Sequence, residues 1–390
     1  VIRGMDMTGC GDFARRGLEF FLKRYNEAGF LTTGYTIVGT GENLWTLAEH
    51  FRRTGDQAWM KGAAPIVARA CQWIARTRQK TMRLDARGEK PPEFGLMPPG
   101  VTADWGRYAY RYFNDAQYCT GLKMAADALA EIGHPDAAAL RADAKQYRED
   151  LLRAYRWTQS RSPVVPLQNG TWVPNCPAML DCFGNIEDFL PGEDGNRSWA
   201  YSVEIGTNHL VATGVLDADS HDAAWIADYA EDVQYLRTGM NDYPEEKNRS
   251  DIFNFGGFAK VQPYYGRIAE VHALRDDVRP FVRSYFNALA SLLSEENLSL
   301  WEHFHNTAGW NKTHETGWFL CQTGTMLAME RKGELWLAPL VPEYWLEDGK
   351  QTSVRNLPTP YGKVSYQIAS SVAQGRIEAR IEPPARQPKR

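Results

Sequence analysis

The sequence predicts an all-α protein with a small β appendage at its C-terminal end. Before residue 332, about ten segments carry apolar residues at helical spacing, and they follow one another in hairpin-like pairs. No alternating strand pattern separates them. After Gly333 the pattern changes, because the segments 353–356, 361–368 and 376–381 alternate or are β-rich, with turns between them. We therefore expect a helical body followed by a small sheet.

The predicted helices have uneven loops between them. The helices are expected at residues 12–25, 42–53, 58–77, 114–132, 136–157, 199–213, 218–237, 263–274, 277–293 and 318–329. Residues 87–107 and 162–195 are rich in Pro and Gly, and residues 239–262 form a third long loop with an aromatic run. Loops of this length inside a compact domain are usually functional.

The change in pattern also divides the chain. We expect a helical catalytic domain over residues 1–332, whose first hairpin is incomplete, and a small β-sheet domain over residues 333–382. The tail, residues 383–390, is expected to be disordered because chain ends without apolar residues are seldom held in place. An upstream segment of the same protein is a further expected partner of the first hairpin.

The composition of the chain argues against several classes of function. A net charge of −4 and a pI near 6.1 give no basic surface of the kind that nucleic-acid binding needs. No run of eighteen apolar residues exists, so no membrane partner is expected. The six cysteines are scattered without metal-site spacing, and only Cys176 and Cys182 are close enough in sequence for one disulfide to be considered. We expect no metal and no other cofactor, and a periplasmic or secreted location rather than a cytoplasmic one.

Residues 299–318 concentrate the side chains that a sugar site needs. Glu302 lies between Trp301 and His303, and further aromatic, basic and acidic residues follow it. Aromatic rings pack against the apolar C–H faces of a sugar, while acids and imidazoles bind hydroxyls or transfer protons. The alternative is a surface loop in which Glu302 closes a salt bridge with a neighbouring arginine. The cluster as a whole favours a carbohydrate partner.

The end of the chain resembles a known group of enzymes. Its motifs are Leu-Trp-Glu-His-Phe (300–304), Asn-Lys-Thr-His-Glu-Thr-Gly-Trp (311–318), Leu-Trp-Leu-Ala-Pro (335–339) and Val-Arg-Asn-Leu-Pro-Thr (354–359). They resemble the end of bacterial α-L-rhamnosidase-type catalytic domains, within the six-hairpin glycosidases. This resemblance implies an (α/α)6 toroid or barrel, a general base at Glu302, and a site lined by Asn311 and His314.

A second resemblance concerns the proton donor. Ala-Asp-Trp (103–105), followed by Asn-Asp-Ala-Gln-Tyr (114–118) at a helix start, is similar to the central segment of maltose-phosphorylase-type members. It implies Asp104 as the general acid, and apolar walls from Trp105 would raise the pKa of that carboxyl. Glu204, near the start of a predicted helix, is the alternative acid. The helices are fewer than six full hairpins require, and the Asp-rich acid motif and the phosphate-binding Ser/Gly pattern of these families are absent.

The remaining candidates are expected to bind substrate. They are Trp105, Asp115, Trp199, Asp251, Tyr264, Trp301, His303, His305, Trp310, Asn311, Lys312, His314 and Glu315. For Asp115, capping of a helix is the alternative role. The histidines lie in a loop rather than at i, i+4 on a helix, which argues against a metal. Five other tryptophans lie on helical stripes and are expected in the core: Trp45, Trp59, Trp73, Trp225 and Trp318.

These residues predict an inverting glycoside hydrolase that acts on an oligo- or polysaccharide. One carboxylic acid would protonate the leaving oxygen while Glu302 activates a water. A polysaccharide lyase or sugar epimerase on the same barrel is the alternative, with a His or Tyr as base, and Lys312, His314, Tyr264 and Arg267 are compatible with it. A non-catalytic carbohydrate-binding scaffold is the third hypothesis, since a fold by itself does not decide function.

Overall fold

The computed structural model describes residues 1–33, 38–102, 105–184, 186, 204–234, 262–303 and 311–389. Its helices are α1 (Ile2–Met7), α2 (Gly11–Leu22), α3 (Gly39–Thr54), α4 (Gln57–Arg78), α5 (Tyr112–Glu131), α6 (Ala137–Gln159), α9 (Asn208–Ala212), α10 (His221–Tyr229), α12 (Ile268–Arg275), α13 (Val278–Leu292) and α14 (Thr313–Leu327). Most predicted helices are found near their expected positions, and α1 is an addition. Of the helix expected at residues 199–213, only Asn208–Ala212 is a described helix, and residues 199–203 lie outside the described residues. None of the described helices is long and apolar enough to cross a membrane.

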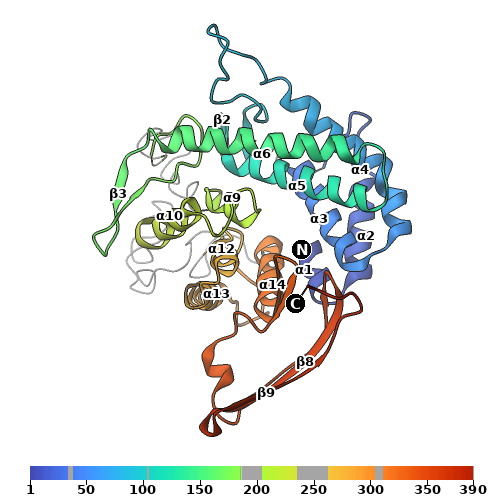
Figure 1. The fold of residues 1–390 in the computed structure, drawn as a ribbon, viewed down its shortest axis with the longest axis vertical. Helices are drawn as coiled ribbons and strands as arrows, with labels where there is room; N and C mark the ends of the chain where they lie inside the picture. The colour runs from blue at the N-terminus through green and yellow to red at the C-terminus, as the bar shows by residue number, and fades with distance from the viewer. Residues whose placement is uncertain are drawn as a thin grey trace.

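The helices contact one another in two layers. Within the described residues, α1, α3, α5, α9, α12 and α14 form a closed ring in which each helix contacts the next. The helices α2, α4, α6, α10 and α13 pack outside this ring, each against the inner helix that precedes or follows it. Figure 1 shows this arrangement around a common centre. We propose that the ring is the inner layer of the expected (α/α)6 barrel.

The closest approach in the ring is between α3 and α5. A Cβ added to Gly121 would lie 2.2 Å from the carbonyl oxygen of Gly41, and one added to Gly41 would lie 2.8 Å from the carbonyl oxygen of Gln117. Both obstacles are backbone atoms, so no side-chain rotation can relieve them. The two glycines therefore allow the helices to pack backbone against backbone and bring the first turn of α3 beside Gln117.

Gly121→Ala is expected to destabilise the protein by about 1–3 kcal/mol, the usual cost of overpacking a tight contact. The sign of this change in stability is informative, because replacing Gly by Ala inside a helix normally stabilises a protein by up to about 1 kcal/mol. Urea denaturation measures the change. Gly62→Ala on α4 is the matched control, since nothing lies within 4 Å of a Cβ placed there. Equal stability of the two variants would contradict the close contact.

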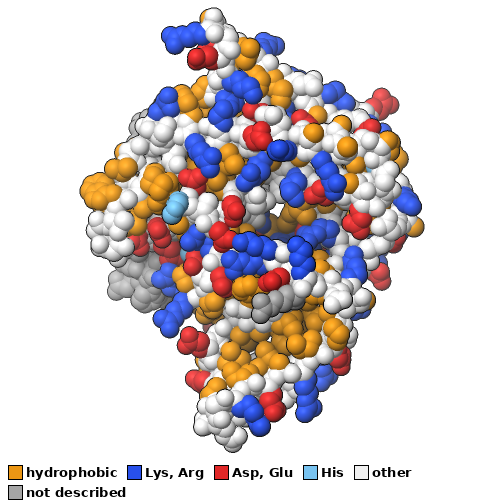
Figure 2. Space-filling view, in the orientation of Figure 1, with side chains coloured by type: hydrophobic (Ala, Val, Ile, Leu, Met, Phe, Trp, Pro, Cys, Tyr) orange, Lys and Arg blue, Asp and Glu red, His pale blue; other side chains and the backbone are white. Residues whose placement is uncertain are grey.

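The β appendage follows α14 directly. A hairpin of β5 (Ala328–Arg331) and β6 (Glu334–Leu337) precedes a three-stranded antiparallel sheet in the order β7 (Gln351–Thr359), β8 (Gly362–Ser371) and β9 (Arg376–Glu382). Strand structure thus begins at Ala328 rather than at residue 333. The sheet extends away from the helices (Figure 1), and hydrophobic side chains gather over it, whereas acidic and basic side chains are mixed elsewhere on the same face (Figure 2).

Three features of the chain can be compared with what the sequence indicated. The tail was expected to be disordered, yet the backbone N–H of Arg386 donates to the Tyr361 carbonyl (2.8 Å) and its guanidinium donates to the Arg52 carbonyl (2.7 Å) at the end of α3. Cys176 and Cys182 form no disulfide with each other, and both are buried. The long loops at 87–107 and 162–195 contain short hairpins, β1 (Gly100–Thr102) with β2 (Trp105–Ala109) and β3 (Val164–Pro166) with β4 (Trp172–Pro174).

Candidate active site

A cavity of about 430 Å³ lies inside the ring of inner helices. Its wall comes from α1, α3, α5, α14 and the turn before α12, with Phe21 of α2 and Leu31 and Thr33 of the segment that leads to α3. The side chains that line it combine aromatic surface with groups that bind or transfer protons, namely Trp45, Trp318, Tyr265, Glu42, Gln117 and His314. A concave site with aromatic surface and a few converging polar groups is the usual form of a small-ligand site.

Two tryptophans form an aromatic layer across the centre of the ring. The rings of Trp45 and Trp318 are stacked with centroids 5.8 Å apart, and both side chains are half-buried. The guanidinium of Arg3 lies 5.0 Å from the Trp45 ring, and that of Arg267 lies 4.2 Å from the Trp318 ring. Both tryptophans were predicted to belong to the core. Trp318 does pack against the core around α12–α14, but both side chains also line the central cavity.

Glu302 is held between two segments of chain. Its Oε1 accepts a hydrogen bond from Nε2 of Gln262 (2.9 Å), and its Oε2 lies 2.7 Å from Nζ of Lys312. The Gln262 N–H also donates to the Glu302 carbonyl (3.0 Å). The glutamate side chain is 15 % exposed, so it remains accessible to water. The salt bridge that was the alternative role for Glu302 therefore exists, with a lysine in place of an arginine.

His314 stands in the first turn of α14, on the cavity wall. Its ring meets that of Tyr265 edge-on with centroids 5.3 Å apart, and its Nε2 is buried with no hydrogen-bond partner among the described residues. Burial, followed by the positive charges of Lys312 and the N-terminal amine and by His303, lowers the pKa of His314 to about 3. His314 is therefore a neutral imidazole at physiological pH. Within the described residues, no group of three acidic, histidine or cysteine side chains is placed to hold a metal ion.

Glu315 and Tyr264 have structural positions instead of the substrate contacts that the sequence suggested. The Glu315 carboxylate is fully buried and accepts the backbone N–H groups of Tyr264 (3.0 Å) and Tyr265 (2.9 Å). It thereby ties the turn before α12 to the start of α14. The Tyr264 ring is buried in the core around α12–α14, where its hydroxyl donates to the Tyr285 carbonyl (2.9 Å). The neighbouring Tyr265 is the tyrosine that reaches the cavity.

Asp115 is also a buried structural residue. Its Oδ1 accepts the Met97 N–H (2.8 Å) and the Tyr147 hydroxyl (2.7 Å). Burial raises the pKa of Asp115 to about 6, although both hydrogen bonds oppose the shift. It joins the segment before β1 to α5 and α6. Asp115 was expected to bind sugar or to cap a helix, and its contacts correspond to neither role.

Of the two acids expected as proton donors, only Glu204 is among the described residues. Asp104 lies outside the described residues, and Trp105 is described only through its backbone in β2. Glu204 is buried and does not line the cavity, and its carbonyl lies 2.8 Å from Nε2 of His209. Burial raises the pKa of Glu315, and the charges of Glu204 and Glu302 raise it further.

The other expected substrate contacts are placed as follows. Trp199, Asp251, His305 and Trp310 lie outside the described residues. Trp301 is half-buried and packs against the core around α12–α14, and His303 lies close enough to His314 to influence its pKa. Asn311 is exposed in the left-handed backbone region (φ 55°) just before α14 and does not line the cavity. Of the pair suggested by the resemblance, only His314 reaches the cavity.

Glu42 is the cavity residue that the sequence reasoning missed. It is half-buried in the first turn of α3, and its carboxyl has no side-chain partner among the described residues. Burial raises its pKa to about 7, against the opposing charges of Arg267 and the N-terminal amine. The available signal was Gly41, whose close contact with α5 shows that this turn faces inward.

The comparisons with known proteins give little further guidance. No protein-family model and no curated protein matches the chain. Among solved structures, the chain is similar to one described as a sialidase, with a TM-score of 0.45 and 12% identity, over 87% of this chain and 31% of that chain. The chain therefore spans about a third of the length of that protein. A likeness at this level assigns neither a fold nor an activity.

Proposed function

We propose that the protein is an inverting glycoside hydrolase that acts on an oligo- or polysaccharide. The observation that carries the proposal is the central cavity. There the stacked Trp45 and Trp318 are combined with the carboxyl group of Glu42 and the neutral imidazole of His314. Aromatic surface of this kind complements the apolar face of a sugar ring. Glu302 does not itself line this cavity, but it is joined through Lys312 to the segment that leads into His314 on the cavity wall.

Glu302 is proposed as the general base. A base must be negatively charged and must reach a water beside the anomeric carbon. The contacts from Lys312 and Gln262 hold the Glu302 carboxylate in one orientation, and its exposed edge leaves room for that water. In an inverting enzyme the water attacks the face opposite the leaving group, so the acid and the base lie about 6.5–9.5 Å apart.

A lyase or epimerase remains the second candidate because of one contact. His314 is neutral and lies edge-on to Tyr265, and the charge of Lys312 acts on His314. A neutral imidazole beside a phenol can abstract a proton α to a uronate carboxylate, which a lysine would then bind. Arg267 is less available for that carboxylate, because its guanidinium pairs with Glu270 and stacks on Trp318.

The first-formed product distinguishes these mechanisms. The protein is incubated with a panel of oligosaccharides, and proton NMR follows the anomeric signals before mutarotation. We expect the anomer opposite in configuration to the substrate, because a single displacement by water inverts the centre. If the anomeric configuration is retained, Glu302 acts as a nucleophile and not as a general base. A product that absorbs in the ultraviolet would instead identify a lyase, and binding without any product would identify a scaffold.

A further inference from the structure

We propose that Glu42 is the proton donor of this site: a carboxylic acid on α3 that protonates the departing glycosidic oxygen. The inference rests on the proposed glycosidase function and deepens it, since Glu204 does not line the cavity and Asp104 lies outside the described residues. It depends on where Glu42 lies, on what its carboxyl contacts and on which of its two protonation states the surroundings favour.

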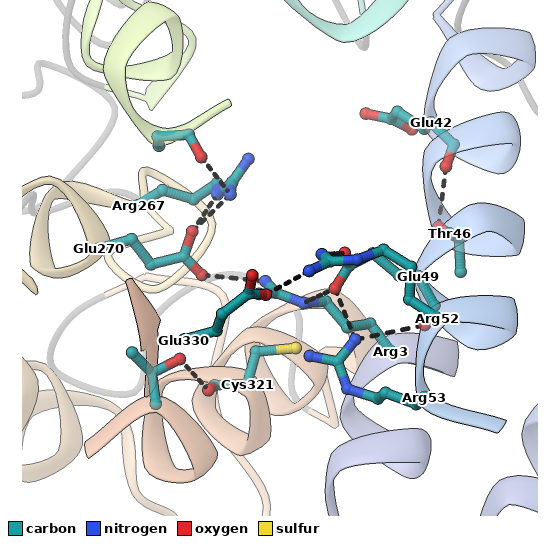
Figure 3. Close-up of polar contacts among 12 residues, drawn as sticks. Arg3, Glu42, Thr46, Glu49, Arg52, Arg53, Arg267, Glu270, Cys321 and Glu330 are labelled. Carbon is teal, nitrogen blue, oxygen red and sulfur yellow. Dashed lines mark hydrogen bonds and ion pairs between the residues drawn. The ribbon is translucent and has the colours of Figure 1, made fainter. Parts of the chain in front are cut away.

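The position of Glu42 follows from the packing of α3 on α5. Gly41 brings the first turn of α3 against the α5 backbone, so that Glu42 and Gln117 line the same cavity. Trp45 and Thr46 follow at i+3 and i+4 and therefore share the inward face of α3 with Glu42. Figure 3 shows the Glu42 side chain projecting from α3 toward the side on which Arg267 lies. An acid on this wall is adjacent to the aromatic surface that would hold the sugar.

The contacts of Glu42 differ from those of the other central glutamates. Glu49 pairs with Arg52 and Arg53, and Glu270 pairs with Arg267. Glu330 is ion-paired with Arg52 in the same region (Figure 3). Each of those three carboxyl groups is thereby engaged by an arginine. Among the described residues, no side chain donates a hydrogen bond to the Glu42 carboxyl, which leaves it free for a substrate oxygen.

The surroundings of Glu42 favour the neutral acid over the carboxylate. Burial raises its pKa to about 7, although the charges of Arg267 and the N-terminal amine act in the opposite direction. The other titratable or charged groups on the cavity wall are Arg3, Tyr265, His314 and Cys321. His314 is uncharged at this pH, and the guanidinium of Arg3 lies on the Trp45 ring. A donor that keeps its proton near neutral pH is what glycoside cleavage requires.

The step is balanced without any cofactor. Glu42 gives its proton to the glycosidic oxygen as the C1–O bond breaks, and the bonding electron pair stays on that oxygen. Water adds to C1 from the opposite face and loses a proton to Glu302. Glu42 ends as a carboxylate and Glu302 as an acid. Solvent then returns one proton to Glu42 and takes one from Glu302.

The test compares two leaving groups in Glu42→Gln. With an oligosaccharide, whose alkoxide leaves poorly, kcat/KM should fall about 10²–10⁴-fold, the usual contribution of a general acid. With the 2,4-dinitrophenyl glycoside of the sugar that the wild type releases, the loss should be less than about tenfold, because dinitrophenolate leaves without a proton. The wild type should also lose oligosaccharide activity as the pH rises through about 7, because Glu42 then loses its proton. With the dinitrophenyl glycoside, activity should not fall over this pH range.

Controls separate this role from a structural one. Glu27→Gln, at an exposed glutamate, should behave as the wild type, and urea denaturation should give Glu42→Gln an unchanged midpoint. Glu42→Asp, which keeps an ionisable carboxyl, should retain more oligosaccharide activity than Glu42→Gln. Equal losses on both substrates, or full oligosaccharide activity in Glu42→Gln, would exclude Glu42 as the donor. If the wild type cleaves neither glycoside, the protein is not a glycoside hydrolase, and Glu42 is then not a proton donor.

Discussion

Glu302→Gln is expected to lower turnover of a glycoside about 10²–10⁴-fold while sugar binding stays close to that of the wild type. The amide keeps the size of the side chain and can still accept the Gln262 hydrogen bond, but it cannot take a proton from water. The loss should therefore appear in kcat rather than in KM. Unlike Glu42→Gln, this variant should lose activity on the dinitrophenyl glycoside as well, because a good leaving group does not replace the base.

Calorimetry with an oligosaccharide, together with an activity assay, tests both halves of this expectation. Glu295→Gln is the matched control, since Glu295 is exposed in the preceding turn. The lost ion pair with Lys312 should cost stability by no more than about 1 kcal/mol, because both side chains are partly exposed. Wild-type turnover in Glu302→Gln would remove this residue from the mechanism. Loss of binding and turnover together would show that Glu302 holds the sugar or the loop.

The helices were accessible from the sequence because long amphipathic segments repeat a clear 3.6-residue period. α1 was missed because a helix of 6 residues is too short to show that period. The short hairpins β1–β2 and β3–β4 were hidden in segments whose prolines and glycines indicate irregular structure. The tail was judged by its composition alone, which does not reveal that Arg386 finds carbonyl acceptors at the end of α3.

The candidate site was only partly accessible, for a physical reason. A helical stripe that faces a central cavity has the same spacing as one that faces a solid core, so Trp45 and Trp318 were assigned to the core. Adjacent residues in a turn point in different directions, and the sequence does not tell which of Tyr264 and Tyr265 faces inward. Glu315 has the composition of a site residue, but its carboxylate is used by two backbone N–H groups.

Glu49→Ala is expected to have the largest effect on stability, about 3–5 kcal/mol, the usual cost of removing one partner from a buried ion pair. The Glu49 carboxylate is 4 % exposed and accepts hydrogen bonds from Arg52 (2.8 Å) and Arg53 (2.5 Å), and it lies 3.5 Å from Nε of Arg3. The contact with Arg3 joins α1 to α3 (Figure 3). Without Glu49, the guanidinium of Arg53, only 8 % exposed, stays buried without its carboxylate.

Urea denaturation at neutral pH measures this cost, and Glu19→Ala is the matched control. Glu19 pairs with Arg15 on the surface of α2, where the two side chains are 45% and 43% exposed, so its removal should cost less than about 1 kcal/mol. Glu49→Gln should fall between the two, because the amide keeps the volume and one acceptor. If Glu49→Ala and Glu19→Ala were equally stable, the buried network would contribute no more than a surface ion pair.

Acid should reduce the difference between the wild type and Glu49→Ala. Burial alone would raise the pKa of Glu49, but the charges of Arg53, Arg3 and Arg52 outweigh it and hold the pKa well below its usual value of 4.5. A depressed pKa in the folded state stabilises the protein above the unfolded-state pKa, and this contribution is lost as the pH falls below it. The wild type should therefore lose stability more steeply than Glu49→Ala between about pH 4.5 and pH 2.5. Parallel curves over this range would show that the arginines do not hold Glu49 as a carboxylate.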